Sequence, residues 1–150
     1  MLNIIFVCTG NICRSPMAEG FLRYKWHGME RGALFVSSMG IHGVTDSPAT
    51  EHAQAVCRKN GFDISSHRAR CLVGEELLRA DLILCMEPVQ KKFVQVFFPW
   101  RRDRVALLGA WPDKETRKSA IEDPMGGSYK KYQKIFAIIK EHIERIIPLL

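Results

Sequence analysis

The sequence predicts an α/β domain in which a parallel sheet is covered by helices on both faces, a three-layer sandwich. Four short apolar runs alternate along the chain with segments of helical periodicity, an order typical of parallel sheets. Residues 81–86 are apolar after the opening aspartate, as expected of a strand buried on both faces. The chain contains no internal repeat, low-complexity segment or linker, so we expect one domain over residues 1–150.

The first half of the chain is expected to contain two strands and two helices. Ser15-Pro16 suits the start of a helix, because serine caps helix N-termini and proline tolerates the first helical position. Ser47-Pro48 repeats this pattern, and Asn60-Gly61 is a plausible helix end. The expected elements are a strand at 3–7, a helix at 16–27, a strand at 34–38 and a helix from 48 to 60.

The second half is expected to end in the clearest helix of the chain. Bulky apolar residues recur there at helical spacing after a capping Ser128, and Pro148 ends the pattern. Residues 109–127 are expected to be mostly loop. The expected elements are a short helix at 74–79, a strand at 81–86, a helix from 88 to 98, a strand at 104–108 and the final helix.

Composition and charge exclude several functional classes. The N-terminal apolar run is too short for a signal sequence, and no segment approaches the length needed to cross a bilayer. Five scattered cysteines do not form a disulfide framework, so we expect free thiols and a cytoplasmic location. The net charge of +6 favours anionic partners. Because the basic residues are scattered, we expect neither nucleic acid nor a membrane as a partner.

The stretch from Cys8 to Ser15 is expected to bind an oxyanion. It connects a strand end to a helix start, where backbone N–H groups and the helix dipole favour negative charge. Gly10 allows close approach of the backbone, and Asn11 tolerates a left-handed conformation. Arg14 offers a planar fork for two oxygens of a tetrahedral anion.

This loop differs from an ordinary phosphate-binding loop because its first residue, Cys8, can act as a nucleophile. A free thiol is mostly protonated at neutral pH, but Cys8 is expected to be a thiolate above the loop N–H groups and near Arg14. Ser15 is placed to donate its hydroxyl to the Cys8 sulfur. The alternative is a buried strand-end thiol beside an unrelated surface arginine. The Walker-type Gly-Lys-Ser/Thr is absent, and Cys8 and Cys13 lack the usual zinc-ligand spacing, so we expect neither a Walker-type nucleotide site nor a zinc site.

Residues 7–16 resemble the motif Val-Cys-x-Gly-Asn-Ile-Cys-Arg-Ser-Pro of the low-molecular-weight protein tyrosine phosphatases. The similarity extends over nearly the whole chain, through residues 17–19, 36–38, 61–70 and 81–86 to Asp123-Pro124. It implies a flavodoxin-like fold with strand order 2-1-3-4. It also implies a protein-tyrosine phosphatase that needs no cofactor or metal.

The resemblance implies roles for individual residues. Cys8 attacks phosphorus, while Arg14 and the loop of Thr9, Gly10, Asn11, Ile12, Cys13 and Ser15 hold the phosphate. Asp123 protonates the leaving oxygen and then activates the water that hydrolyses the cysteinyl-phosphate. Ser38 and His67 match positions that support the loop, together with Asn11 and Ser15. Under oxidation, Cys13 is expected to form a disulfide with Cys8.

The chain differs from the family at the positions that form the walls of the substrate-binding slot in relatives. Met125-Gly126 follows Asp-Pro where many relatives carry aromatic residues, residues 41–47 contain no aromatic residue, and Met39 replaces the usual alanine. Tyr129 and Trp111 are candidates for a compensating wall. Phosphomonoester hydrolysis is therefore the firmer expectation, with a phosphotyrosine protein or a small aryl phosphate as the substrate. We expect a monomer or weak self-association.

Two rival functions stay open. An arsenate reductase of the same fold needs two more cysteines for a disulfide relay. Cys85 lies near the first of these positions, but Lys91 and Lys92 stand where the second is expected. The other rival is a non-catalytic module that binds phosphoproteins or nucleic acid through the basic surface.

Overall fold

A four-stranded parallel sheet organises the chain in the computed structural model, which describes residues 1–150. The strand order is β2-β1-β3-β4, which confirms the predicted order and the parallel α/β architecture. The strands are β1 (Leu2–Cys8), β2 (Leu34–Gly40), β3 (Leu82–Cys85) and β4 (Val105–Leu107). The helices are α1 (Arg14–His27), α2 (Glu51–Lys59), α3 (Gly74–Arg79), α4 (Pro88–Phe97) and α5 (Tyr129–Ile146).

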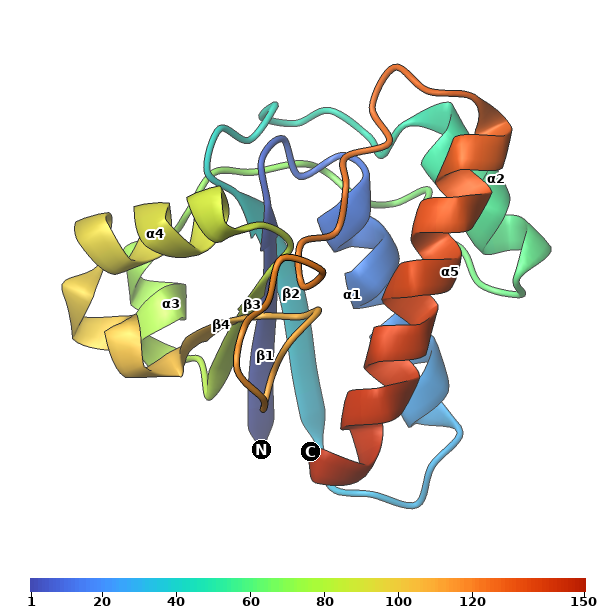
Figure 1. Cartoon of the computed structure of the whole chain (residues 1–150). Helices are drawn as coiled ribbons and strands as arrows, with labels where there is room; N and C mark the ends of the chain where they lie inside the picture. Colours follow the sequence, from blue (N-terminus) through green and yellow to red (C-terminus); the bar gives the residue numbers. More distant parts are fainter.

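Helices cover both faces of the sheet, as predicted (Figure 1). On one face, α1, α2 and α5 pack on alternate residues of β1 and β3, among them Ile4, Phe6 and Leu84. On the other face, α3 and α4 pack on the residues in between, such as Val7 and Cys85. This alternation follows from the pleat of the strands, which points successive side chains to opposite faces.

The site is positioned by the place of β1 within the sheet. β1 pairs with β2 on one side and with β3 on the other, so the strand order reverses next to it. Ligands of open α/β sheets bind at such a switch point, outside the carboxyl ends of the strands. Figure 1 shows the loop between β1 and α1 at that end of the sheet.

The predicted starts of the first two long helices were wrong. The first begins at Arg14 with Cys13 as its N-cap, and Ser15 lies inside the helix with its hydroxyl directed to Cys8. The second begins at Glu51, because Thr50, and not Ser47, accepts the hydrogen bond from the Ala53 N–H group.

The remaining elements agree with expectation to within a few residues. Ser128 caps α5 by accepting a hydrogen bond from the Lys131 N–H group, and Pro88 opens α4. Two 3₁₀ helices, Pro99–Arg104 and Ile147–Leu149, were not predicted. None of the helices combines the length and the apolar character that crossing a membrane requires.

Candidate active site

The loop from Cys8 to Ser15 turns its backbone N–H groups to one side and its carbonyls to the other. The carbonyls of residues 8, 9 and 10 accept hydrogen bonds from the N–H groups of Ile41, His42 and Val44. Those of residues 11 and 12 accept from the His67 ring and the Thr50 N–H group. The N–H groups of residues 9–13 donate to no protein atom. Unpaired N–H groups at a strand-to-helix junction are typical of an anion site.

Asn11 holds the loop in this shape. Its φ of 59° lies in the left-handed region, which asparagine tolerates better than most residues. Its side-chain Oδ1 accepts from the Arg70 N–H group at 3.0 Å, so the amide nitrogen faces the other way. That nitrogen donates to Ser15 Oγ at 2.8 Å and to Ser38 Oγ at 2.9 Å.

The predicted supporting residues therefore meet around the loop. Ser38 accepts from Asn11 and donates to Glu19 Oε1 at 2.7 Å. His67 Nε2 lies 2.7 Å from the Asn11 carbonyl oxygen, so that nitrogen carries the proton. Gly40 lets the end of β2 come this close, because a Cβ there would lie 2.5 Å from the Thr9 carbonyl oxygen.

Arg14 is buried beneath the loop and held from two sides. Its Nη1 donates to Glu87 and to the Ile121 carbonyl oxygen at 2.7 Å, and its Nη2 lies 3.6 Å from Asp123 Oδ2. Its Nε is buried without a hydrogen-bond partner. A buried guanidinium normally satisfies its donors, so this N–H group is a further unpaired donor for an anion.

Glu87 is the functional residue that sequence reasoning missed. It lies two residues after the end of β3, at the carboxyl edge of the sheet, and it pairs with Arg14 while it caps α4. The available signal was an acidic residue at the end of a buried parallel strand, where ligand sites of this architecture lie.

Asp123 reaches the same pocket from the loop after β4. The pocket has a volume of about 240 Å³, and Cys8, Cys13, Arg14 and Asp123 are among its lining residues. The Asp123 side chain is 46% exposed, and its Oδ1 accepts from the Met125 N–H group at 3.0 Å. A carboxyl group open to solvent beside a buried thiol can exchange protons with a bound ester and with water.

The walls of the pocket are apolar but contain no phenylalanine, tyrosine or tryptophan. They are formed by Ile12, Val44 and Met125, with the imidazole of His42. Trp111 and Tyr129 do not line the pocket, so neither supplies the aromatic wall that we considered. Both instead pack against the core formed by α1, α2 and α5.

The thiols of Cys13 and Cys85 are both buried. Cys13 is buried beside Tyr132 and Thr50, with its sulfur 3.3 Å from the Tyr132 hydroxyl, and burial raises its pKa. Cys85 is fully buried on the face of the sheet that α3 and α4 cover, and burial raises its pKa as well. Cys85 therefore packs in the core, as expected. No group of three or more His, Cys, Asp or Glu side chains is arranged to hold a metal ion.

Comparisons with known proteins agree with this geometry. The family model described as low molecular weight phosphotyrosine protein phosphatase matches residues 3–149. The chain is 37% identical over 145 residues to the probable low molecular weight protein-tyrosine-phosphatase EpsP of Ralstonia solanacearum, covering 97% of this chain and 93% of the relative.

Two solved structures extend the comparison to three dimensions. The low molecular weight protein tyrosine phosphatase of T. tengcongensis superposes with a TM-score of 0.93 at 33% identity, covering 100% of both chains. The YwlE arginine phosphatase of Geobacillus stearothermophilus superposes with a TM-score of 0.85 at 30% identity, covering 97% of this chain and 90% of that one. This chain therefore belongs to the low molecular weight phosphotyrosine protein phosphatase family.

Proposed function

We propose that this protein hydrolyses phosphotyrosine and related aryl phosphates through a cysteinyl-phosphate on Cys8. One observation carries the proposal. The N–H groups of residues 9–13 and the Nε of Arg14 have no protein partner, and most of these residues line a small pocket together with Cys8 and Asp123. Preorganised donors of this kind stabilise the charge that develops on the equatorial oxygens in phosphoryl transfer.

The first step forms the covalent intermediate. The Cys8 sulfur donates an electron pair to phosphorus, and the bond between phosphorus and the phenolic oxygen breaks. Asp123, in its protonated form, gives its proton to that oxygen, so a neutral phenol leaves. Arg14 and the loop N–H groups hold the three remaining oxygens throughout.

The second step returns the enzyme to its starting state. Asp123, now a carboxylate, takes a proton from a water molecule that attacks phosphorus. The bond between phosphorus and sulfur breaks, and inorganic phosphate is released. The Ser15 hydroxyl, 3.0 Å from the Cys8 sulfur, donates to the departing thiolate.

The pocket walls favour an uncharged aromatic leaving group. Val44 and Met125 offer apolar surface to a phenyl ring. A phosphoarginine substrate would instead bring a guanidinium group into the pocket. Asp123 is the only carboxylate among the lining residues, and it already faces Arg14. We therefore place phosphotyrosine ahead of phosphoarginine, the substrate class that the name of one structural relative indicates.

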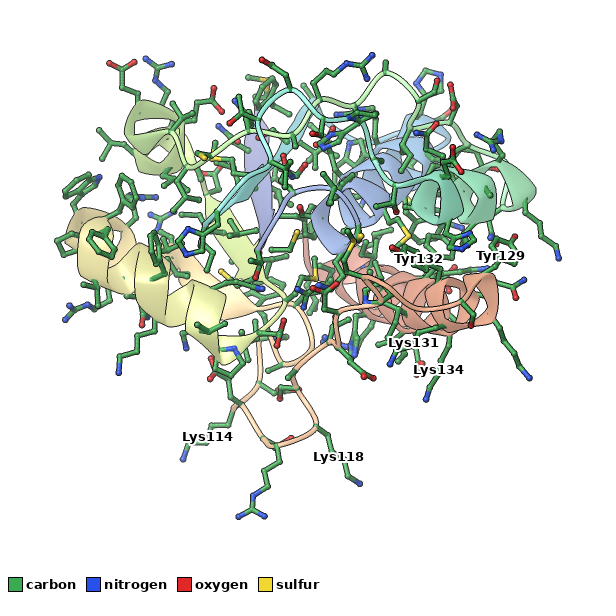
Figure 2. The ribbon with its side chains drawn as sticks, turned by 90° about the horizontal axis from the view of Figure 1, so that it is seen from above. Lys114, Lys118, Tyr129, Lys131, Tyr132 and Lys134 are labelled. Atoms are coloured by element: carbon green, nitrogen blue, oxygen red, sulfur yellow. The ribbon has the colours of Figure 1, made fainter.

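Basic side chains near the Asp123 loop support an anionic substrate. Figure 2 shows Lys114 and Lys118 on a protruding loop and Lys134 on α5, all pointing to the same side of the molecule, whereas the neighbouring Lys131 is paired with Glu122. Positive potential on this side raises the local concentration of a phosphate dianion. We propose phosphorylated proteins as partners and, given five free thiols, a cytoplasmic location.

The test is a side-by-side assay of an aryl phosphate, phosphotyrosine, phosphoserine and phosphoarginine in the presence of a chelator. We expect turnover of the first two, none with Cys8→Ser, and strongly slowed turnover with Asp123→Ala. The Asp123→Ala loss is expected to be largest for phenols of high pKa, because these leave poorly without a proton. Activity that survives Cys8→Ser, or that requires a divalent cation, contradicts the mechanism. Arsenate-dependent thiol oxidation without phosphatase activity favours the reductase, and phosphopeptide binding without turnover favours a binding module.

A further inference from the structure

Helix α4 carries a stripe of apolar side chains that the core does not cover. Val89, Val96 and Phe97 are 59%, 57% and 60% exposed, and Phe93 is partly exposed. Their spacing places all four on one side of the helix. The buried side consists of Gln90 and Val94. Large apolar residues that gather on one helix face, beside a functional pocket, mark an interaction surface.

The stripe begins at the rim of the candidate active site. The His42 ring lines the pocket and packs edge-on against Phe93, with ring centroids 5.7 Å apart and planes at 72°. Phe93 in turn packs on Phe97 at 4.5 Å. An unbroken row of rings therefore leads from the pocket wall onto the outer side of α4.

The start of α4 is also tied to the phosphate-binding loop. Gln90 donates to the Thr9 hydroxyl at 3.1 Å, and Glu87, which caps the helix, holds Arg14. Figure 1 shows the helix running outward from the end of the sheet where this loop lies. The helix is thus fixed relative to the bound phosphate, as a specificity surface must be.

We propose that the α4 stripe, Val89, Phe93, Val96 and Phe97, binds the polypeptide next to the phosphotyrosine of a protein substrate and selects apolar side chains there. The proposal rests on the proposed function. A pocket of about 240 Å³ holds a phosphate and a ring, so the flanking residues of a protein substrate lie outside its rim. The stripe continues that rim on one side, with no charged residue among its four members.

The length of α4 supports a short extended peptide segment as the ligand of the α4 stripe. Ten helical residues span about 15 Å, which equals four or five residues of extended chain. In an extended segment every second side chain points the same way. The stripe therefore contacts apolar side chains at two positions separated by one residue.

Kinetics with peptides test the proposal. The probes are two series of phosphotyrosine peptides, one with Leu or Phe at alternate positions before the phosphotyrosine and one with them after it. Peptides with Ser at the same positions and an aryl phosphate serve as comparison substrates. We expect wild-type kcat/KM to favour one of the Leu/Phe series. Phe97→Ser should lower kcat/KM for that series about tenfold, the order expected when a bound aromatic contact is lost. It should leave the aryl phosphate and the Ser peptides unchanged.

Leu78→Ser is the matched control, because Leu78 is 54% exposed on α3, outside the stripe. It should leave all substrates unaffected. Equal kcat/KM of the wild type for all peptides, or an equal loss on every substrate in Phe97→Ser, overturns the proposal. So does sedimentation equilibrium that shows a wild-type dimer converted to a monomer by Phe97→Ser, since a second copy then covers the stripe. Failure of the proposed function is distinct, because the aryl phosphate itself would not be hydrolysed.

Discussion

The Ser15 hydroxyl donates its hydrogen bond to the sulfur of Cys8. Its oxygen already accepts a hydrogen bond from the Asn11 amide, whose orientation is set by the Arg70 N–H group at the other end. The Cys8 sulfur lies 3.0 Å away. The backbone of Arg70, outside the pocket, thus determines which way a hydrogen bond runs at the nucleophile.

Replacing Ser15 with Ala is therefore expected to slow the breaking of the bond between phosphorus and sulfur more than its formation. A hydrogen bond to a charged group contributes about 1.5–3 kcal/mol, so kcat should fall roughly tenfold to hundredfold. Rapid-mixing kinetics with an aryl phosphate should show a burst of phenol, followed by slow turnover while the cysteinyl-phosphate accumulates. An unchanged kcat without a burst contradicts this role.

Asn11 is expected to be more important for stability than its size suggests. Asn11→Ala loses its side-chain hydrogen bonds and also places an alanine at a φ of 59°, which costs about 1–2 kcal/mol by itself. Asn11→Gly loses the same hydrogen bonds but tolerates that φ. Urea unfolding should show both variants less stable than the wild type, with Gly above Ala by about 1 kcal/mol. Equal stability of the two variants would show that backbone strain does not matter here.

The outlines of the fold and of the loop could be predicted because they depend on local features. Apolar runs predicted the strands, and Cys8 through Ser15 stood out as a strand-to-helix junction with glycine and asparagine. The role of Ser15 as a helix cap was predicted wrongly, because a tertiary contact outweighed a local preference: its hydroxyl serves Cys8 and Asn11. Thr50 rather than Ser47 caps α2 for a reason that is also non-local, since its N–H group is held by the Ile12 carbonyl.

Residues joined across the sheet could not be predicted in this way. Glu87 and Arg14 are 73 positions apart, and nothing near Glu87 in the sequence distinguishes it from the other acidic residues. Asp123 was selected only through family resemblance, since Asp-Pro alone is an ordinary turn. Their proximity results from the strand order, which brings the ends of β1 and β3 together.

Glu87 is expected to position Arg14 and to stabilise the fold. Arg14 is buried, so Glu87→Ala removes the nearer of its two carboxylates and leaves only Asp123, at 3.6 Å; the complete loss of a buried partner costs about 3–5 kcal/mol, which is the upper limit here. Glu87→Gln keeps a hydrogen-bond acceptor for the guanidinium and for the helix cap. We expect Tm and kcat/KM for an aryl phosphate to fall in the order wild type, Gln, Ala. If Ala matches Gln in both measurements, the hydrogen bond to Arg14 is unimportant, and if Gln matches the wild type, the charge of Glu87 is unimportant.

His142 should make the free energy of unfolding depend on pH. Burial lowers its pKa from the usual 6.5, and Arg145, which can only donate, lies 3.2 Å from its Nδ1 and keeps that nitrogen unprotonated. Below about pH 6.5, His142 therefore binds a proton in the unfolded chain but not yet in the folded chain. The free energy of unfolding consequently falls as the pH falls. Urea unfolding between about pH 7.5 and about pH 5.5 should show a smaller loss in His142→Gln than in the wild type. Equal losses would contradict the assignment.

The five cysteines should differ sharply in their reaction with iodoacetamide at neutral pH. Burial raises the pKa of Cys13 and Cys85, and it raises the pKa of Cys57 to about 12, so these thiols stay protonated at neutral pH. Cys71 is exposed, and Cys8 opens into the pocket. Mass spectrometry should find only Cys8 and Cys71 modified in the folded protein and all five in urea.

Inorganic phosphate provides the control for this labelling, because it should occupy the loop above Cys8 and leave Cys71 untouched. We expect phosphate to slow modification of Cys8 in proportion to its occupancy and to have no effect on Cys71. Cys71→Ser should leave one reactive thiol per chain, whose labelling abolishes activity. Rapid modification of Cys85 would contradict its place in the core.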